Sequence, residues 1–173
     1  MQWILVGLGN PGAKYIHTRH NVGREFLLEC EGELPSASRR KSTIVTPDTF
    51  MNKSGTAVKP FIKSAKAAQQ LVVLHDDLDL PLGTVKVSFG RGSAGHKGVE
   101  SVERAVKTKN YIRIRIGISA ECKSGAVKKP DVLGKFKPSE AAALKKAKKS
   151  VKDALDLLLA EGLAKTMTEI NAR

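Results

Sequence analysis

The chain has 173 residues, of which 41% are hydrophobic and 27% are charged. This length and balance are typical of one globular domain with a buried core. The 30 Lys and Arg side chains exceed the 17 Asp and Glu side chains and leave a net charge of +13, which favours a polyanionic partner, above all a nucleic acid. No apolar run approaches the length of a transmembrane helix and no apolar leader opens the chain, so we expect a cytoplasmic protein without a membrane partner. Cys30 and Cys122 lack metal-like spacing, which indicates reduced thiols.

The first apolar run and the loop after it form the strongest local pattern. Residues 3–6 predict a short buried strand, and the following GLGNPG at 7–12 predicts a tight turn at the carboxyl end of that strand. Ligands of α/β sheets bind at such strand ends. The same glycines match the dinucleotide-binding pattern G-x-G-x-x-G, but the residues after Gly12 lack a helical apolar period, and Glu31 and Glu33 follow no predicted strand. A nucleotide site is therefore one disfavoured alternative, and a purely structural glycine turn is another.

Apolar periodicity divides the rest of the chain into alternating strands and helices. Asn21 and Ser139 are predicted N-caps of two helices, and Pro60 predicts a kink in a third. The alternation is typical of a three-layer α/β fold, and we expect a single domain over residues 1–173. The further predicted strands are 42–46, 71–74, 85–89 and 111–118; the predicted helices are 22–30, 53–68, 98–107 and 139–161; and the predicted irregular segments are the loops 31–41 and 119–138 and the tail 162–173.

Polar side chains follow the predicted strands, where loops should gather at one rim of the sheet. A His with a carboxylate partner can act as a general base for water, because the carboxylate fixes the tautomer and stabilises the imidazolium. Asn side chains can bind a peptide carbonyl and amide. No His or Cys spacing suggests a metal, and no Gly-x-Ser-x-Gly motif suggests a serine nucleophile. The residues alone thus leave open a hydrolase or a nucleic-acid-binding domain. The polar side chains expected at this rim are Asn10, His20, Asn52, Asp76, His96 and Lys97.

Several strings along the chain form a longer and more specific pattern. They are VGLGNPG at 6–12, Tyr15 with TRHNVG at 18–23, TFMNKSG at 49–55, HDDLDLPLG at 75–83, and GSAGHKGVES at 92–101 with RIRIGI at 113–118. In this order they resemble the bacterial-type peptidyl-tRNA hydrolases. The resemblance implies a twisted mixed sheet with helices on both faces. It also implies an enzyme that cleaves the ester between a peptide and the 3′-terminal ribose of tRNA.

The resemblance also implies roles for particular residues. His20 would activate water, Asp76 would orient His20, and Asn10 and Asn52 would hold the peptide end and the reacting carbonyl. No cofactor, metal or obligate protein partner is implied, and we expect a monomer. The other residues implied are Tyr15, Phe50, Met51, His96 and Lys97 for substrate binding, and Lys86, Arg113 and Arg115 for tRNA binding.

Two departures from the family pattern accompany the resemblance. Lys97 stands where the family usually has Asn, and a lysine there is suited to a phosphate or a developing oxyanion. Residues 23–42 form a shorter segment than the family's, which predicts a sheet without one edge element. A non-catalytic RNA-binding relative of the same fold is the alternative function, and the presence of both His20 and Asp76 argues against it.

Overall fold

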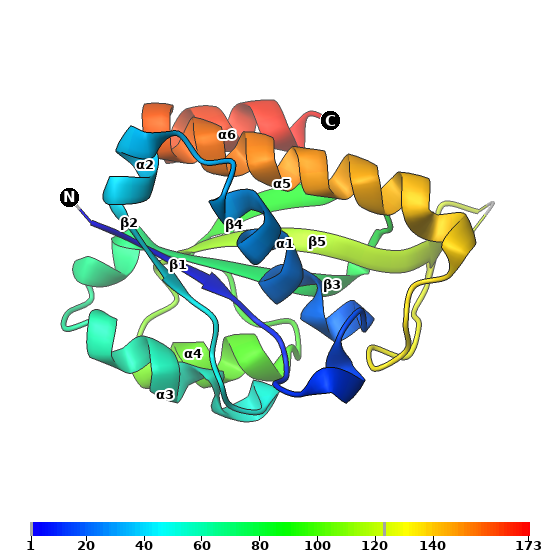
Figure 1. Cartoon of the computed structure of the whole chain (residues 1–173), viewed down its shortest axis with the longest axis horizontal. Coiled ribbons are helices and arrows are strands. Elements are labelled where there is room, and N and C mark those ends of the chain that lie inside the picture. Colours follow the sequence, from blue (N-terminus) through cyan, green and yellow to red (C-terminus); the bar gives the residue numbers. More distant parts are fainter. Residues whose placement is uncertain (1, 123) are drawn as a thin grey trace.

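A mixed sheet runs through the middle of the molecule (Figure 1), in the computed structural model that describes residues 2–122 and 124–173. Its strands lie in the order β2-β1-β3-β5-β4. The first four are parallel, and β4 pairs antiparallel with β5, whose far end also pairs with β6. The strands are β1 (Trp3–Gly7), β2 (Ser42–Val45), β3 (Leu71–Pro81), β4 (Val85–Phe89), β5 (Ile112–Glu121) and β6 (Val127–Lys128).

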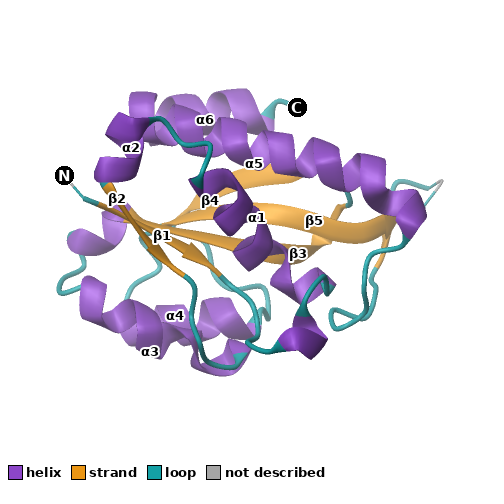
Figure 2. Cartoon of the chain, viewed as in Figure 1, coloured by secondary structure: helices purple, strands orange, loops and turns teal. Residues whose placement is uncertain are grey.

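Helices cover both faces of this sheet (Figure 2), so the predicted three-layer α/β fold is confirmed. Among the described helices, none combines the length and the apolar character that a bilayer span requires. One layer holds α1 (Val22–Glu31), α2 (Ser36–Arg40), α5 (Ala141–Glu161) and α6 (Leu163–Asn171), and the other holds α3 (Ser54–Val58) and α4 (Lys97–Val106).

The two central strands show how the sequence creates two cores. In β3, Val72 and Leu74 pack in the core beneath α1 and α5, whereas Leu71 and Val73 pack in the core beneath α3 and α4. A parallel strand covered on both faces needs such a continuous apolar run. In β5 the isoleucines at 112, 114, 116 and 118 all face the α1 and α5 layer, so the intervening arginines face the α4 layer.

Gly23 brings α1 unusually close to β3. A Cβ at this position would lie 2.3 Å from the carbonyl oxygen of Leu74, so only glycine allows this approach. The Arg24 amide also donates to the Leu8 carbonyl at 3.0 Å, which ties the start of α1 to the first loop. His20 belongs to the 3₁₀ turn Arg19–Asn21 directly before α1, and it is therefore held beside β3.

The structure corrects several predicted boundaries. β3 continues past Leu74 to Pro81 instead of ending before His75, because the following residues remain paired with β5. The helix predicted over 53–68 is instead α3, which ends at Val58, and a 3₁₀ turn at Lys59–Phe61 follows. Pro60 explains this break, since proline has no amide donor for the next helical hydrogen bond and its ring crowds the preceding turn.

Three segments predicted to be irregular hold regular structure. Residues 31–41 contain α2, and residues 119–138 contain the end of β5 and the strand β6. Residues 162–173, predicted to be a tail, contain α6, whose Ile170 is fully buried in the core. The Asn171 side chain also bonds the amide and carbonyl of Val87 at the free edge of β4, at 2.7 and 2.9 Å. Tertiary contacts therefore order this segment.

Asn21 is the N-cap residue of α1, as predicted, but its side chain does not cap the helix, and the predicted N-cap Ser139 is wrong, because Glu140 is the N-cap of α5. The Asn21 side chain makes no capping bond and instead bonds the backbone of Asn10. Before α5, the Glu140 side chain accepts from the Lys137 amide at 2.6 Å, and Ser139 lies inside this 3₁₀ turn. The Asn21 side chain therefore bonds the neighbouring loop and not the amides of its own helix.

The first glycine loop does not lead into a helix. Gly12 has φ +101° and is followed by the 3₁₀ turn Ala13–Tyr15, and no α-helix begins before Val22 in the described chain. The dinucleotide pattern needs a helix amino terminus at its third glycine to bind the pyrophosphate. The loop therefore lacks the structural context of a nucleotide site, which the sequence already disfavoured.

Candidate active site

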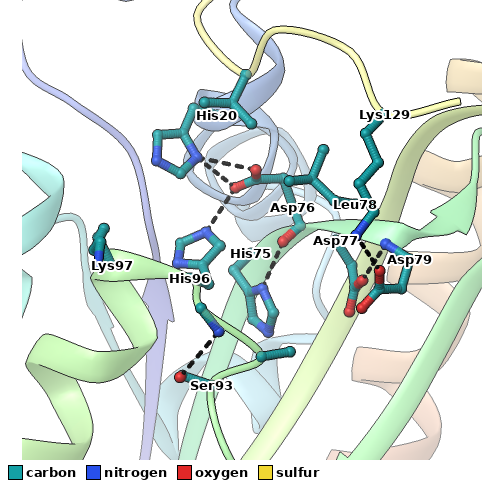
Figure 3. A pocket seen from close by; sticks show the side chains of 13 residues that line it. His20, His75, Asp76, Asp77, Leu78, Asp79, Ser93, His96, Lys97 and Lys129 are labelled. Atoms are coloured by element: carbon teal, nitrogen blue, oxygen red, sulfur yellow. Dashed lines mark hydrogen bonds and ion pairs between the residues drawn. The ribbon is translucent and has the colours of Figure 1, made fainter.

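Two histidines from distant parts of the chain meet at Asp76 (Figure 3). His20 Nδ1 lies 2.9 Å from each carboxylate oxygen of Asp76, and His96 Nε2 lies 2.8 Å from Oδ1. Asp76 comes from β3, His20 from the turn before α1, and His96 from the N-cap of α4. The Asp76 side chain is only 2% exposed and the His20 side chain is 13% exposed. The carboxylate is therefore buried beneath His20, and both residues line a pocket at this end of the sheet.

The backbone around His96 fixes its tautomer. Its Nδ1 accepts from the amides of Gly98 and Val99 at 3.1 and 3.3 Å, and amides can only donate. Nδ1 is therefore unprotonated, and Nε2 carries the proton donated to Asp76. His20 in turn donates from Nδ1 to the same carboxylate, which leaves its Nε2 lone pair free. A neutral imidazole with a free Nε2 and a buried carboxylate behind it can act as a general base.

Asp76 stays ionised because of these two partners. Burial alone would raise the pKa of its carboxyl group, but the hydrogen bonds that His96 and His20 donate, and the positive charge that either ring carries when protonated, outweigh that effect. The pKa of Asp76 is held well below its usual range. A permanently charged carboxylate is what a neighbouring imidazolium needs when it forms during proton transfer.

The same three residues also have the spacing of a metal site. Their ligand atoms all lie within 4.8 Å of one another among the described residues. A metal-bound histidine normally donates through its second ring nitrogen, but the second nitrogen of His96 accepts two amide protons. The proton on His96 Nε2 therefore makes this nitrogen a donor to Asp76, and the cluster fits hydrogen bonding better than metal ligation.

Asn10 lies in the loop that follows β1, and both its side chain and its backbone are held by hydrogen bonds. Its Oδ1 accepts from the Met51 amide at 2.8 Å, and its backbone amide and carbonyl bond the Asn21 side chain at 2.8 and 2.9 Å. Asn10 is 7% exposed, and its side-chain bond among the described residues is made through Oδ1, not through Nδ2. This amide group can therefore donate to a ligand without breaking an internal bond.

The outer residues of the predicted site are more exposed. Phe50 is 55% exposed and contacts Tyr15 edge to face, with ring centroids 6.3 Å apart. Asn52 is exposed on the same segment, whereas Met51 is 5% exposed and packs in the core beneath it. The Lys97 side chain is 70% exposed and lines the pocket that holds His20.

Residues 4–173 match the model of a protein family described as peptidyl-tRNA hydrolase. The chain belongs to the peptidyl-tRNA hydrolase family. It is 32% identical to the peptidyl-tRNA hydrolase of Bdellovibrio bacteriovorus, with 98% of this chain and 99% of the relative covered. It is 37% identical to the peptidyl-tRNA hydrolase of Geotalea daltonii, with 97% and 95% covered. The first alignment spans 185 positions, more than this chain's 173 residues, so that relative has residues without a counterpart here.

The fold agrees with this membership. The crystal structure of peptidyl-tRNA hydrolase from Acinetobacter baumannii superposes with a TM-score of 0.82 at 29% sequence identity. The superposition covers 99% of this chain and 95% of the other. The family resemblance drawn from the sequence strings is thereby confirmed over nearly the whole chain.

The three residues predicted to bind tRNA in this family member differ in their burial and in their partners. Lys86 Nζ donates to the Asn171 carbonyl at 2.7 Å, and the partly buried Arg115 forms an ion pair with the buried Asp77 at 2.7 Å. Arg113 is only 3% exposed and donates to the Gly92 carbonyl at 2.8 Å. The prediction that Arg113 lies on a basic surface is therefore wrong, because the 90–95 loop covers the face of β5 that carries Arg113.

Two residues that support this peptidyl-tRNA hydrolase site were not predicted from the sequence to belong to it. One is Asn21, which clamps the Asn10 backbone; the other is His75, which is 1% exposed and donates from Nδ1 to the Asp76 carbonyl at 2.7 Å. Burial, then the positive charges of a protonated His96 and of Arg113, lower the pKa of His75 well below its ordinary value. A strand prediction extended past Leu74 would have put His75 on the buried α4 face by alternation.

Proposed function

We propose that this chain hydrolyses the ester between a peptide and the 3′-terminal ribose of tRNA, with His20 as the general base. One observation supports this mechanism above all others, namely the 2.9 Å contact between His20 Nδ1 and the buried Asp76. It leaves Nε2 of a neutral imidazole free at the pocket, as base catalysis requires. Membership of the peptidyl-tRNA hydrolase family supports the substrate.

The proposed reaction begins with a water molecule beside His20 Nε2. The water oxygen attacks the ester carbonyl carbon as its proton moves to Nε2, and Asp76 stabilises the imidazolium that forms. The tetrahedral intermediate then collapses and the bond to the ribose oxygen breaks. The imidazolium returns its proton to that oxygen, which yields a free peptide carboxyl group and a free tRNA.

The surrounding residues have separate proposed roles. The Nδ2 of Asn10 and the exposed amide of Asn52 would bind the peptide end and the reacting carbonyl, since amide side chains match both partners of a peptide backbone. Tyr15 and Phe50 form an aromatic wall for the peptide. Lys97 would place positive charge at the pocket, where an oxyanion develops or a phosphate lies.

The tRNA body would be attracted by the charge of the whole chain. A net charge of +13 raises the local concentration of a polyanion and its association rate. Arg115 and Lys86 remain candidates for direct contact, whereas Arg113 is too deeply buried for it. A cytoplasmic location and a monomeric state remain predictions, and sedimentation equilibrium tests the second.

Ester release from an N-acetylaminoacyl-tRNA and from the same aminoacyl-tRNA with a free amine tests the proposal. We expect the wild type to cleave the blocked substrate selectively. His20→Asn should lose this activity while its amide still donates to Asp76, and the matched control His17→Asn should retain it, because His17 is a 75% exposed histidine of the same loop. Equal turnover by His20→Asn and the wild type would contradict the mechanism. Tight tRNA binding without cleavage by the wild type would favour the non-catalytic RNA-binding alternative.

A further inference from the structure

A buried pair of side chains lies directly beneath the candidate active site. His75 is 1% exposed and Arg113 is 3% exposed, and both are on the α4 face of the sheet. Arg113 Nη1 lies 3.5 Å from His75 Nε2, and Arg113 Nη2 donates to the Gly92 carbonyl at 2.8 Å. Arg113 does not line the pocket that holds His20, and His75 lines it but is almost fully buried, so the proposed reaction gives neither side chain a role.

The segment that this pair touches carries His96. Residues 90–95 form a largely exposed loop with positive φ angles at Gly90 (+70°), Ala94 (+50°) and Gly95 (+84°). Such a loop has little intrinsic rigidity. His96 at its end must nevertheless lie within 2.8 Å of Asp76, which belongs to a different element. Something has to hold the loop against the sheet.

The bonds of the pair connect the loop to the strand that carries Asp76. His75 Nδ1 donates to the Asp76 carbonyl at 2.7 Å (Figure 3), so its Nε2 is left as the acceptor that faces Arg113. Arg113 then donates to Gly92 in the loop, four residues before His96. The His75 ring also packs against the His96 ring, with centroids 4.8 Å apart and planes at 65°. A chain of contacts therefore runs from Asp76 through His75 and Arg113 to the loop.

We propose that Arg113 and His75 are positioning residues, which fix the 90–95 loop so that His96 donates to Asp76. Arg113 suits this role because its planar fork presents several donors in a rigid geometry, and one donor can face Gly92 while another faces His75. A neutral His75 suits it because a protonated ring would lose the acceptor and repel the guanidinium. The effect on turnover rests on the proposed function, whereas the effect on His96 does not.

The imidazole NMR spectrum of the ¹⁵N-histidine-labelled protein without substrate tests the positioning role alone. We expect the wild type to show a hydrogen-bonded, downfield Nε2 proton for His96, assigned by its absence from His96→Asn. Arg113→Met should lose or broaden that signal, while Arg104→Met, at an exposed position on α4, should keep it. An unchanged His96 signal in folded Arg113→Met, or its absence from the wild type, would overturn the proposal.

Kinetics with N-acetylaminoacyl-tRNA then separate positioning from RNA binding. We expect Arg113→Met to lower kcat at least tenfold with little change in the KM for tRNA and in its salt dependence. Arg115→Met should instead raise KM and weaken the salt dependence, as expected for a phosphate contact. A raised KM with unchanged kcat in Arg113→Met would assign Arg113 to RNA binding and overturn the inference. An inactive wild type would contradict the proposed function and leave the NMR test valid.

A pair of His75 variants covers the case in which Arg113→Met does not fold. Gln places an acceptor near the position of Nε2, so His75→Gln can still bond Arg113, whereas His75→Leu has a similar volume and no polar atom. We expect His75→Gln to retain more kcat and more of the His96 signal than His75→Leu at comparable thermal stability. Equal loss in both variants would show a packing role only and would overturn the positioning role.

Discussion

The two sides of the candidate site differ in how far the protein itself satisfies their polar groups. On one side, His20, Asp76 and His96 are largely buried and bond one another at 2.8–2.9 Å. On the other side, Asn52 and Lys97 are exposed, and the Lys97 Nζ is 3.4 Å from one partly buried carboxylate, that of Glu100. The buried side is fixed before any substrate arrives, and the exposed side exchanges water for substrate.

This difference follows from what each side has to do. Proton transfer needs one defined tautomer and a carboxylate that remains charged, and only fixed protein partners can supply both. Substrate-binding groups need unused bonding capacity, so internal partners would compete with the substrate. Substitutions on the buried side should therefore change turnover and stability together, whereas those on the exposed side should change substrate binding alone.

Asp76→Asn should have the largest effect. The amide replaces a charged acceptor of two histidine protons with a group that is itself a donor on one side, so the His20 tautomer is no longer fixed. We expect kcat to fall by about 10³–10⁴-fold, as for other bases that lose their orienting carboxylate. Because the pKa of Asp76 is lowered by folding, its contribution to stability is present at neutral pH and is lost only as the pH falls below the ordinary carboxyl range.

Single-turnover and steady-state hydrolysis assays measure this loss, and Asp153→Asn on α5 is the matched control. Urea unfolding at pH 7 should also show lower stability for Asp76→Asn than for the control. Near-normal kcat in a folded Asp76→Asn protein would show that the buried side of the site does not determine turnover, which contradicts the comparison.

Asn10→Ala should have the next largest effect, on both stability and turnover. It removes the acceptor of the buried Met51 amide, and an unsatisfied buried amide costs about 1–3 kcal/mol. The segment that carries Asn52 should then shift, and kcat/KM should fall by about 10–100-fold, the same order as that free energy. Urea denaturation and steady-state kinetics measure the two effects, with the exposed Asn110→Ala as control. Unchanged stability would mean that Met51 is held by other contacts.

Lys97→Met tests the exposed side and should leave stability within about 0.5 kcal/mol of the wild type. If Lys97 contacts a phosphate, the KM for tRNA should rise by about threefold to tenfold, and the slope of log KM against log salt should fall by about one. The exposed Lys107→Met is the control. A fall in kcat at constant KM would instead indicate that Lys97 stabilises the developing oxyanion. Lys97 would then affect turnover, as the buried residues do.

The smallest effect is expected for the pH dependence of stability in His75→Gln. Folding lowers the pKa of His75, so below about pH 6.5 the unfolded chain takes up a proton that the folded protein does not. This residue therefore makes the wild type less stable as the pH falls from 7 to 5, by at most about 1.4 kcal/mol per pH unit. Urea unfolding at both pH values should show a shallower decline in His75→Gln. Parallel declines in the two proteins would mean that His75 is protonated in the folded state.

The sequence alone determined the class of fold, the family and the residues at the strand ends. β5 illustrates why, because strict alternation from Ile112 to Ile118 assigns each side chain to one of two faces without any knowledge of the neighbouring strands. His20 and Asp76 were likewise predictable as neighbours, because they follow the apolar runs of the parallel strands β1 and β3, whose carboxyl ends meet at one rim. His96 follows the antiparallel strand β4, so only the path of the 90–95 loop and α4 brings it to Asp76. The predicted effect of the shortened 23–42 segment on the sheet edge stays a prediction.

Tertiary structure alone decided which polar groups on those faces are covered. Alternation puts Arg113 and Arg115 on the same face, but the 90–95 loop bonds Arg113 while Arg115, which is partly buried, pairs with Asp77. Asn21 similarly bonds Asn10 rather than capping α1, because the first loop lies beside it. The physical reason is the same in each case: periodicity specifies the direction of a side chain, whereas its partner comes from a segment whose position is set only when the sheet is assembled.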